Sequence, residues 1–83
     1  MRLMMQNLTS RELQVLEQVA EGWDNSAIAH SLFLSLTSVS RLLSGIYTKL
    51  SLDLEEGTYK RVKAAVIYLN WKRSEKDADQ AES

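Results

Sequence analysis

Hydrophobic and polar positions follow the period of an α-helix along most of this chain. The first helical segment, residues 10–21, begins after a capping box, in which Thr9 and Glu12 each bond the other's backbone N–H through their side chains. It ends before Gly22, because glycine readily adopts the left-handed conformation that closes a helix. The residues predicted to form its buried face are Leu13, Val15, Leu16, Val19 and Ala20.

Two further helices are predicted downstream, separated by a three-residue link. Asp24 or Asn25 is expected to cap the second helix, which runs to about Leu32, and Ser35 is expected to cap the third, about 36–50. A continuous apolar row indicates that one side of the third helix is buried. The expected buried residues are Ile28, Ala29 and Leu32 in the second helix, with Phe33 as a further candidate for its inner face, and Val39, Leu43, Ile46 and Leu50 in the third.

A fourth helix is predicted over about 58–72, and it is apolar on two faces. One interpretation places it deep among the other helices, and the other gives its second face to another subunit. One face comprises Tyr59, Val62, Ala65, Val66 and Leu69; the other, taken as the candidate dimerisation face, comprises Ala64, Ile67, Tyr68 and Trp71. The predicted organisation is a flexible arm at 1–7, the domain at 8–73 and a disordered acidic tail at 74–83.

The composition fits one small all-α domain. The 83 residues include no proline and three glycines, which disfavours a turn-rich all-β fold. The chain has no cysteine and a single histidine, His30, so we expect no disulfide, no metal site and no cofactor. No apolar run approaches the roughly 18 residues of a membrane span, and no signal peptide is evident, so a cytoplasmic protein without a membrane partner is expected.

The charge is unevenly distributed between the domain and the tail. The formal net charge is -1, whereas nucleic-acid-binding domains usually carry a basic excess. Residues 74–83 hold one basic and four acidic side chains, a net of -3, which leaves nine basic and seven acidic side chains, a net of +2, on residues 1–73. No nucleophile with a base at motif spacing, no carboxylate pair in a plausible pocket and no phosphate-binding glycine loop is present, so an enzyme is not expected.

The second and third predicted helices, joined by residues 33–35, have the spacing of a helix-turn-helix motif. In such a motif the second helix presents its N-terminal residues to base edges in the major groove. Small hydroxyl side chains and the positive end of the helix dipole suit close approach to phosphates, although hydroxyls also occur there simply as caps. The hydroxyl residues concerned are Ser35, Thr37, Ser38 and Ser40.

A longer set of residues, in register, extends this pattern: Leu8, Thr9, Arg11, Glu12, Val15, Leu16, Ala20, Gly22, Asn25, Ile28, Ala29, Leu32, Phe33, Leu34, Ser35, Val39, Ile46, Lys49 and Leu50. With them the chain resembles the LuxR-type, or GerE-like, helix-turn-helix domain of bacterial transcription regulators over about 8–50 and again near Arg61. The resemblance implies a four-helix domain whose third helix enters the major groove and whose last helix often mediates dimerisation. It also implies a buried ion pair between Glu12 and Arg61.

Departures from the family pattern weaken the expected DNA contacts. Ser40 and Leu42 stand where relatives commonly have lysine and histidine. Arg41 is the favoured base contact because guanidinium bonds guanine bidentately, the alternative being an exposed arginine paired with an acid. Lys49 is expected either to contact phosphate or to be solvated. The full predicted DNA-binding set is Ser35, Thr37, Ser38, Ser40, Arg41, Ser44, Thr48 and Lys49.

Two functions of different classes follow from these observations. The first is a sequence-specific DNA-binding transcription regulator acting as a homodimer on double-stranded DNA. The second is a protein-interaction module that retains the fold, has weakened DNA binding, and binds RNA polymerase or another regulator. The missing cationic residue at Ser40, the apolar Leu42 and the acidic residues of the connection 51–57 motivate the second.

Overall fold

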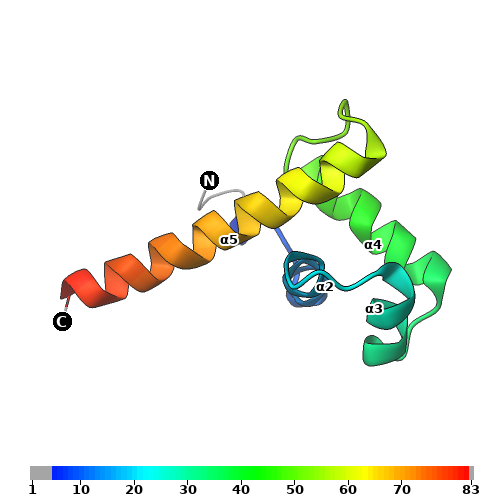
Figure 1. Cartoon of the computed structure of the whole chain (residues 1–83), viewed down its shortest axis with the longest axis horizontal. Helices are drawn as coiled ribbons and strands as arrows, with labels where there is room; N and C mark the ends of the chain where they lie inside the picture. The colour runs from blue at the N-terminus through cyan, green and yellow to red at the C-terminus, as the bar shows by residue number, and fades with distance from the viewer. Residues whose placement is uncertain (1–4, 83) are drawn as a thin grey trace.

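The computed structural model describes the backbone of residues 5–82 and the side chains of residues 5–75. Within these residues the fold is all-α, without strands, and Figure 1 labels its four main helices. A short helical piece at residues 5–6 precedes them. The helices are α2 (Ser10–Ala20), α3 (Asn25–Leu32), α4 (Leu36–Lys49) and α5 (Gly57–Glu82). The predicted all-α class is confirmed.

Helix α2 begins and ends as its sequence predicts. The Thr9 N–H donates to Glu12 Oε1 at 2.8 Å and the Glu12 N–H to Thr9 Oγ1 at 3.1 Å, so both halves of the capping box are present. After the helix Gly22 has a φ of +92°, and the Trp23 N–H donates back to the Gln18 carbonyl at 3.0 Å. The left-handed glycine therefore turns the chain toward α3.

A tight turn joins α3 to α4. Asp24 caps α3 by accepting from the Ala27 N–H at 2.8 Å, and Ser35 caps α4 by accepting from the Ser38 N–H at 3.0 Å. Between the two helices Phe33 is left-handed, with a φ of 57°, and α4 turns by 107° from α3. The inward position considered for Phe33 is wrong: the side chain is 96 % exposed, because the left-handed turn directs it outward.

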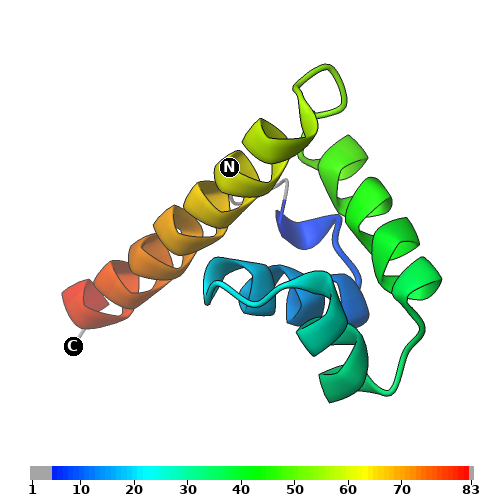
Figure 2. The ribbon, with the colours of Figure 1, turned by 45° about the vertical axis from the view of Figure 1, so that its right-hand side comes forward.

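The core lies where α2, α3, α4 and α5 converge. Helix α5 packs mainly on α2, while α4 packs on α2 and α3, and Figure 2 shows α5 and α4 as two sides of a triangle closed by α2 and α3. Met5 is 2 % exposed and belongs to this core, so the predicted flexible arm, residues 1–7, contributes a residue to the packed domain. Residues 1–4 of that arm lie outside the described residues. The core residues are Met5, Leu8, Val15, Leu16, Val19, Ile28, Ala29, Val39, Leu43, Ile46, Leu50, Leu52, Ala64 and Tyr68.

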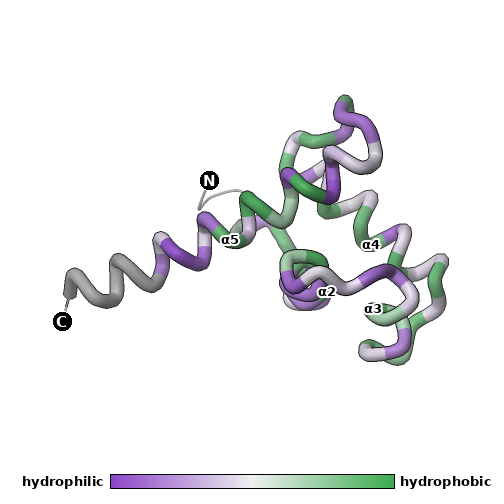
Figure 3. Tube along the Cα trace, viewed as in Figure 1, coloured by the Kyte–Doolittle hydropathy of each residue, from purple (hydrophilic) through white to green (hydrophobic). Residues whose placement is uncertain are grey.

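Helix α5 is longer than its hydrophobic pattern predicts. It continues through residues 74–82, for which a disordered tail was expected, and this segment extends beyond the other helices in Figure 1. Figure 3 shows hydrophobic segments where α5 passes the other helices and hydrophilic ones where it leaves them. Polarity alone misled the prediction, since Glu, Lys, Gln and Ala are good helix formers and extending an existing helix avoids the cost of nucleation.

None of the described helices is by itself long and apolar enough to span a membrane. Helices α3 and α4 reach that length and composition together, but their 107° bend separates them into two elements.

Candidate nucleic-acid interface

One side of α4 anchors the helix and the opposite side is open. Val39, Leu43, Ile46 and Leu50 are buried in the core, as their spacing predicts. Residues on the other side recur at intervals of four, three and four, so they form one row along the helix. We call this the outward row; it comprises Thr37, Arg41, Ser44 and Thr48, all of them exposed.

The outward row carries one charge among small hydroxyl side chains. Arg41 has no ion-pair partner among residues 5–75, so its guanidinium is available to an external acceptor. The small neighbours let a second macromolecule approach the α4 backbone closely. Ser40 is also exposed, beside the outward row. Of the predicted DNA-binding residues, Thr37, Ser40, Arg41, Ser44 and Thr48 therefore lie on accessible surface.

Ser35 and Ser38 already have hydrogen-bond partners. The Ser35 hydroxyl accepts from the Ser38 N–H as the N-cap and donates to Ser38 Oγ, both at 3.0 Å. Their hydroxyls thus help to close the first turn of α4, which is the capping role considered for them. This turn directs the N-terminus of α4, with its partial positive charge, toward solvent beside the outward row.

Lys49 has a partner that neither sequence interpretation anticipated. Its Nζ donates to Glu12 Oε1 at 2.7 Å, and the same oxygen accepts from the Thr9 N–H. The Glu12 side chain is only 8 % exposed and that of Lys49 is 36 % exposed, so the pair is partly buried between α2 and α4. Burial raises the pKa of Glu12, but the hydrogen bonds from Lys49 and Thr9 and the attraction of Lys49 outweigh it, leaving the pKa below its ordinary value.

The predicted ion pair between Glu12 and Arg61 is therefore wrong. Arg61 donates to Asn25 Oδ1 at 2.8 Å and to the Trp23 carbonyl at 2.6 Å, at the start of α3. Lys49, the residue directly before Leu50 at the end of the α4 core row, reaches the Glu12 carboxylate instead. The family resemblance correctly implied a basic partner for Glu12, but which of two distant cations lies beside it depends on helix packing.

The basic residues at the start of α5 are largely engaged within the chain. Lys63 pairs with Glu55 of the acidic connection, and the Lys60 ammonium lies 5.9 Å from the centre of the Tyr47 ring. Arg61 also lies near Tyr47, where burial raises the pKa of the phenol and the charge of Arg61 opposes that shift. These contacts fasten the α4–α5 connection to the domain.

The face of α5 predicted to mediate dimerisation packs within the chain itself. Ala64 and Tyr68 are buried in the chain's own core, and Ile67 and Trp71 pack against it, so this set cannot offer a free surface to a second subunit. Two equally apolar faces look alike in sequence, and the packing of α5, mainly on α2, buries the one that includes Ala64. On the other face Ala65 packs against the core. The exposed residues of that face, which we call the α5 apolar row, are Tyr59, Val62, Val66 and Leu69, each 50–58 % exposed.

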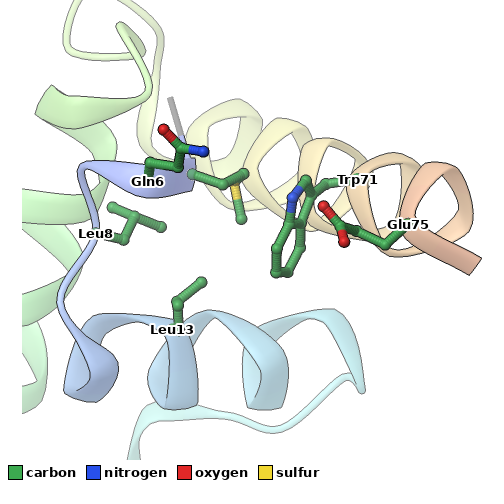
Figure 4. Close-up of a pocket in the computed structure, with 6 residues that line it drawn as sticks. Gln6, Leu8, Leu13, Trp71 and Glu75 are labelled. Atoms are coloured by element: carbon green, nitrogen blue, oxygen red, sulfur yellow. The ribbon is translucent and has the colours of Figure 1, made fainter. Parts of the chain in front are cut away.

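A pocket of about 370 Å³ lies between the N-terminal segment, α2 and α5 (Figure 4). Trp71 enters it from α5 and Leu13 from α2. None of its lining residues comes from α4, so it is separate from the outward row. The lining residues are Met5, Gln6, Leu8, Leu13, Trp71 and Glu75.

Two helices at 107° across a three-residue link, the second with an anchored side and an open side, define a helix-turn-helix DNA-binding domain. Residues 6–56 match the family model described as bacterial regulatory proteins, luxR family, also named GerE. The match covers more than half of the 83 residues, and the chain belongs to this family of DNA-binding transcription regulators, which is not a family of enzymes. No curated protein and no solved structure matched the chain.

The family match ends before α5, which begins at Gly57. It therefore covers the helix-turn-helix and does not extend to the last helix. Sequence reasoning missed the bonds of Arg61 to Asn25 and Trp23, since they join residues 36 and 38 positions apart. It also missed Leu52, a buried residue in the connection with no periodic neighbours.

Proposed function

We propose that this protein is a sequence-specific transcription regulator that inserts α4 into the DNA major groove. The observation that supports it best is the outward row, an exposed set of short hydroxyl side chains around Arg41 on a helix whose other side is fixed in the core. Short side chains let the helix approach the bases, and Arg41 can donate two hydrogen bonds to one guanine.

The charge distribution supports modest non-specific affinity. Each phosphate neutralised contributes about one unit to the salt dependence of binding, and α4 carries only Arg41 and Lys49 as cations, the second already paired. Affinity for DNA of arbitrary sequence is therefore expected to be low. A dimer doubles the number of contacts and selects two half-sites about one helical turn apart.

We propose that the homodimer forms through the α5 apolar row. Its residues recur at intervals of three, four and three, the spacing of the buried seam between two paired helices. Each is about half exposed in the single chain, so pairing with a second copy removes this apolar surface from water. Pairing along one face of α5 leaves α4, on a different side of the domain, free for DNA.

The test is a selection of bound duplexes from a randomised library, followed by fluorescence-anisotropy titration of the selected duplex. Arg41→Ala is expected to weaken binding about 5- to 150-fold, because a bidentate arginine–guanine contact contributes about 1–3 kcal/mol. Arg73→Ala is the matched control, since Arg73 is an exposed arginine on α5 away from the outward row. Its binding is expected to stay within about threefold of the wild type.

Two results would contradict the proposal. Equal weakening by Arg41→Ala and Arg73→Ala would mean that Arg41 contributes only general positive charge. Failure of the wild type to enrich any sequence at low salt would mean that α4 does not recognise bases.

A protein-interaction module that binds RNA polymerase or another regulator is the second candidate. The exposed apolar side chains of the α5 apolar row and the fully exposed Leu54 in the connection favour it. This candidate predicts a complex with such a partner that forms equally well with Arg41→Ala and is lost with a charge at Val66. Enrichment of a DNA sequence by the wild type argues against it as the main function.

A further inference from the structure

The carboxylate of Glu12 joins two helices at one point. Its Oε1 accepts from the backbone N–H of Thr9, which closes the start of α2, and from the ammonium of Lys49 on α4, at 2.8 and 2.7 Å. The two donors approach from different helices. Any movement of α4 relative to α2 that takes Lys49 away from Oε1 therefore leaves a largely buried carboxylate without its counter-charge.

A gap in the side chains of α4 makes room for this carboxylate. Gly45 lies four residues before Lys49, so the two occupy the same side of the helix. A Cβ at Gly45 would stand 3.0 Å from Glu12 Oε2, closer than an ordinary van der Waals contact. The carboxylate thus rests against the α4 backbone at Gly45 and is held by Lys49 one turn further on.

Lys49 is turned away from the outward row. Eight residues separate it from Arg41, which corresponds to about 80° around the helix and about 12 Å along it. The Lys49 side chain extends instead toward α2, where its ammonium bonds the Glu12 carboxylate. A phosphate that drew the ammonium away would have to compete with a carboxylate already at hydrogen-bond distance.

We propose that the Glu12–Lys49 pair sets the angle at which α4 meets DNA, and that Lys49 is a positioning residue and not a phosphate ligand. This inference rests on the proposed function of α4 as the recognition helix. Arg41 then contacts the bases, and Lys49 holds the helix that carries it. The sequence-specific part of the affinity depends on the pair, whereas the salt dependence does not.

The experiment measures binding of the selected duplex by wild type, Glu12→Gln, Lys49→Met and the double variant over a range of salt. Glutamine keeps an oxygen that can accept from the Thr9 N–H, and methionine keeps most of the length of the lysine stem. Lys72→Met is the matched control, an exposed lysine on α5. All titrations are done at a temperature at which circular dichroism shows each variant fully folded, so that loss of fold does not enter the result.

Each single variant is expected to lose about tenfold in affinity, and the double variant about the same tenfold and not a hundredfold, because both remove one interaction. The slope of log affinity against log salt is expected to be unchanged in all three. Residual dipolar couplings of backbone amides, measured without DNA, are expected to report a changed angle between α2 and α4 in both single variants. A pair that only stabilises the fold would leave this angle and the affinity of the folded protein unaltered.

The opposite pattern overturns the inference. A phosphate ligand at Lys49 predicts a salt slope smaller by about 0.9 in Lys49→Met, with affinity unchanged or higher in Glu12→Gln, where the ammonium is released. If Lys49→Met does not fold, Glu12→Gln decides alone: a tenfold loss with an unchanged slope supports the positioning role, and no loss overturns it. Absence of binding by the wild type would instead mean that the proposed function has failed.

Discussion

Arg61 on α5 donates a 2.8 Å hydrogen bond to the side-chain oxygen of Asn25 at the first position of α3. The other arm of the guanidinium reaches the Trp23 carbonyl, so one side chain fastens the α2–α3 turn to the last helix. This turn sets the direction of α3, on which α4 packs. The last helix is thus connected to the helix-turn-helix through a planar, bidentate donor, for which lysine is not equivalent.

We expect Arg61→Ala to lower the free energy of unfolding by about 2 kcal/mol, because it removes two hydrogen bonds from a charged donor. Urea unfolding followed by circular dichroism measures the change. Arg73→Ala, at an exposed position, is expected to stay within about 0.5 kcal/mol of the wild type. Indistinguishable effects of the two substitutions would show that the Arg61 bonds add nothing to stability.

Gly45→Ala tests how tightly Glu12 is held against α4. In an unobstructed helix interior this change stabilises by about 1 kcal/mol, since alanine is the better helix former. Here the new Cβ would meet Glu12 Oε2 at 3.0 Å, and the carboxylate cannot withdraw without loosening its bonds to Thr9 and Lys49. We therefore expect little or no gain in the wild-type background.

The same substitution in a Glu12→Ala background provides the comparison, because the obstructing carboxylate is then absent. There Gly45→Ala is expected to give the full gain of about 1 kcal/mol. Thermal and urea unfolding of the four proteins measure both differences. An equal gain in the two backgrounds would mean that the carboxylate yields without cost.

The Glu12–Lys49 pair also predicts a pH dependence of stability. The pKa of Glu12 is lowered in the folded protein from an ordinary 4.5, so the unfolded chain takes up a proton more readily as the pH falls. The pair's contribution is complete above the unfolded value and is lost as the pH falls through the folded one. The difference in unfolding free energy between wild type and Glu12→Gln is thus expected to be constant at neutral pH and to shrink below pH 4.5.

Comparing these two proteins cancels the titration of the other carboxylates, which both contain. Urea unfolding at a series of pH values gives the difference directly. A difference that stays constant into strong acid would mean that the pKa of Glu12 is the same in the folded and unfolded states.

Val66→Glu is expected to prevent the homodimer proposed through the α5 apolar row. Val66 lies in the middle of the α5 apolar row and is half exposed in the single chain, so the glutamate is solvated in the monomer but buried in the paired state. We expect the dissociation constant to rise about a hundredfold or more, measured by sedimentation velocity over a concentration series. Ser74→Glu adds the same charge at an exposed position outside this row and is expected to leave association unchanged. Equal masses for Val66→Glu and wild type at every concentration would contradict a dimer through this face.

Local features of the fold were predictable from the sequence because short-range chemistry produces them. The Thr9–Glu12 capping box, the left-handed Gly22 and the Ser35 cap each involve atoms within a few residues, and all are present. The buried row of α4 was also predictable, since one helix needs only its own period to define a face. The family resemblance is carried by these same positions and is confirmed by the match over residues 6–56.

Features that join distant segments required the tertiary structure. Whether Glu12 pairs with Lys49 or with Arg61 depends on where two helices cross, and both candidates are cations of similar reach. Likewise the sequence contains two apolar faces on α5, and only docking against α2 decides which is buried.

The amino-acid sequence by itself therefore determined the four helices, the ends of α2, α3 and α4 and the side of α4 that is anchored, because backbone hydrogen bonds and capping act within a few residues. The tertiary structure decided the partner of Glu12 and the exposed face of α5. These depend on packing between segments tens of residues apart, for which no local pattern encodes the geometry.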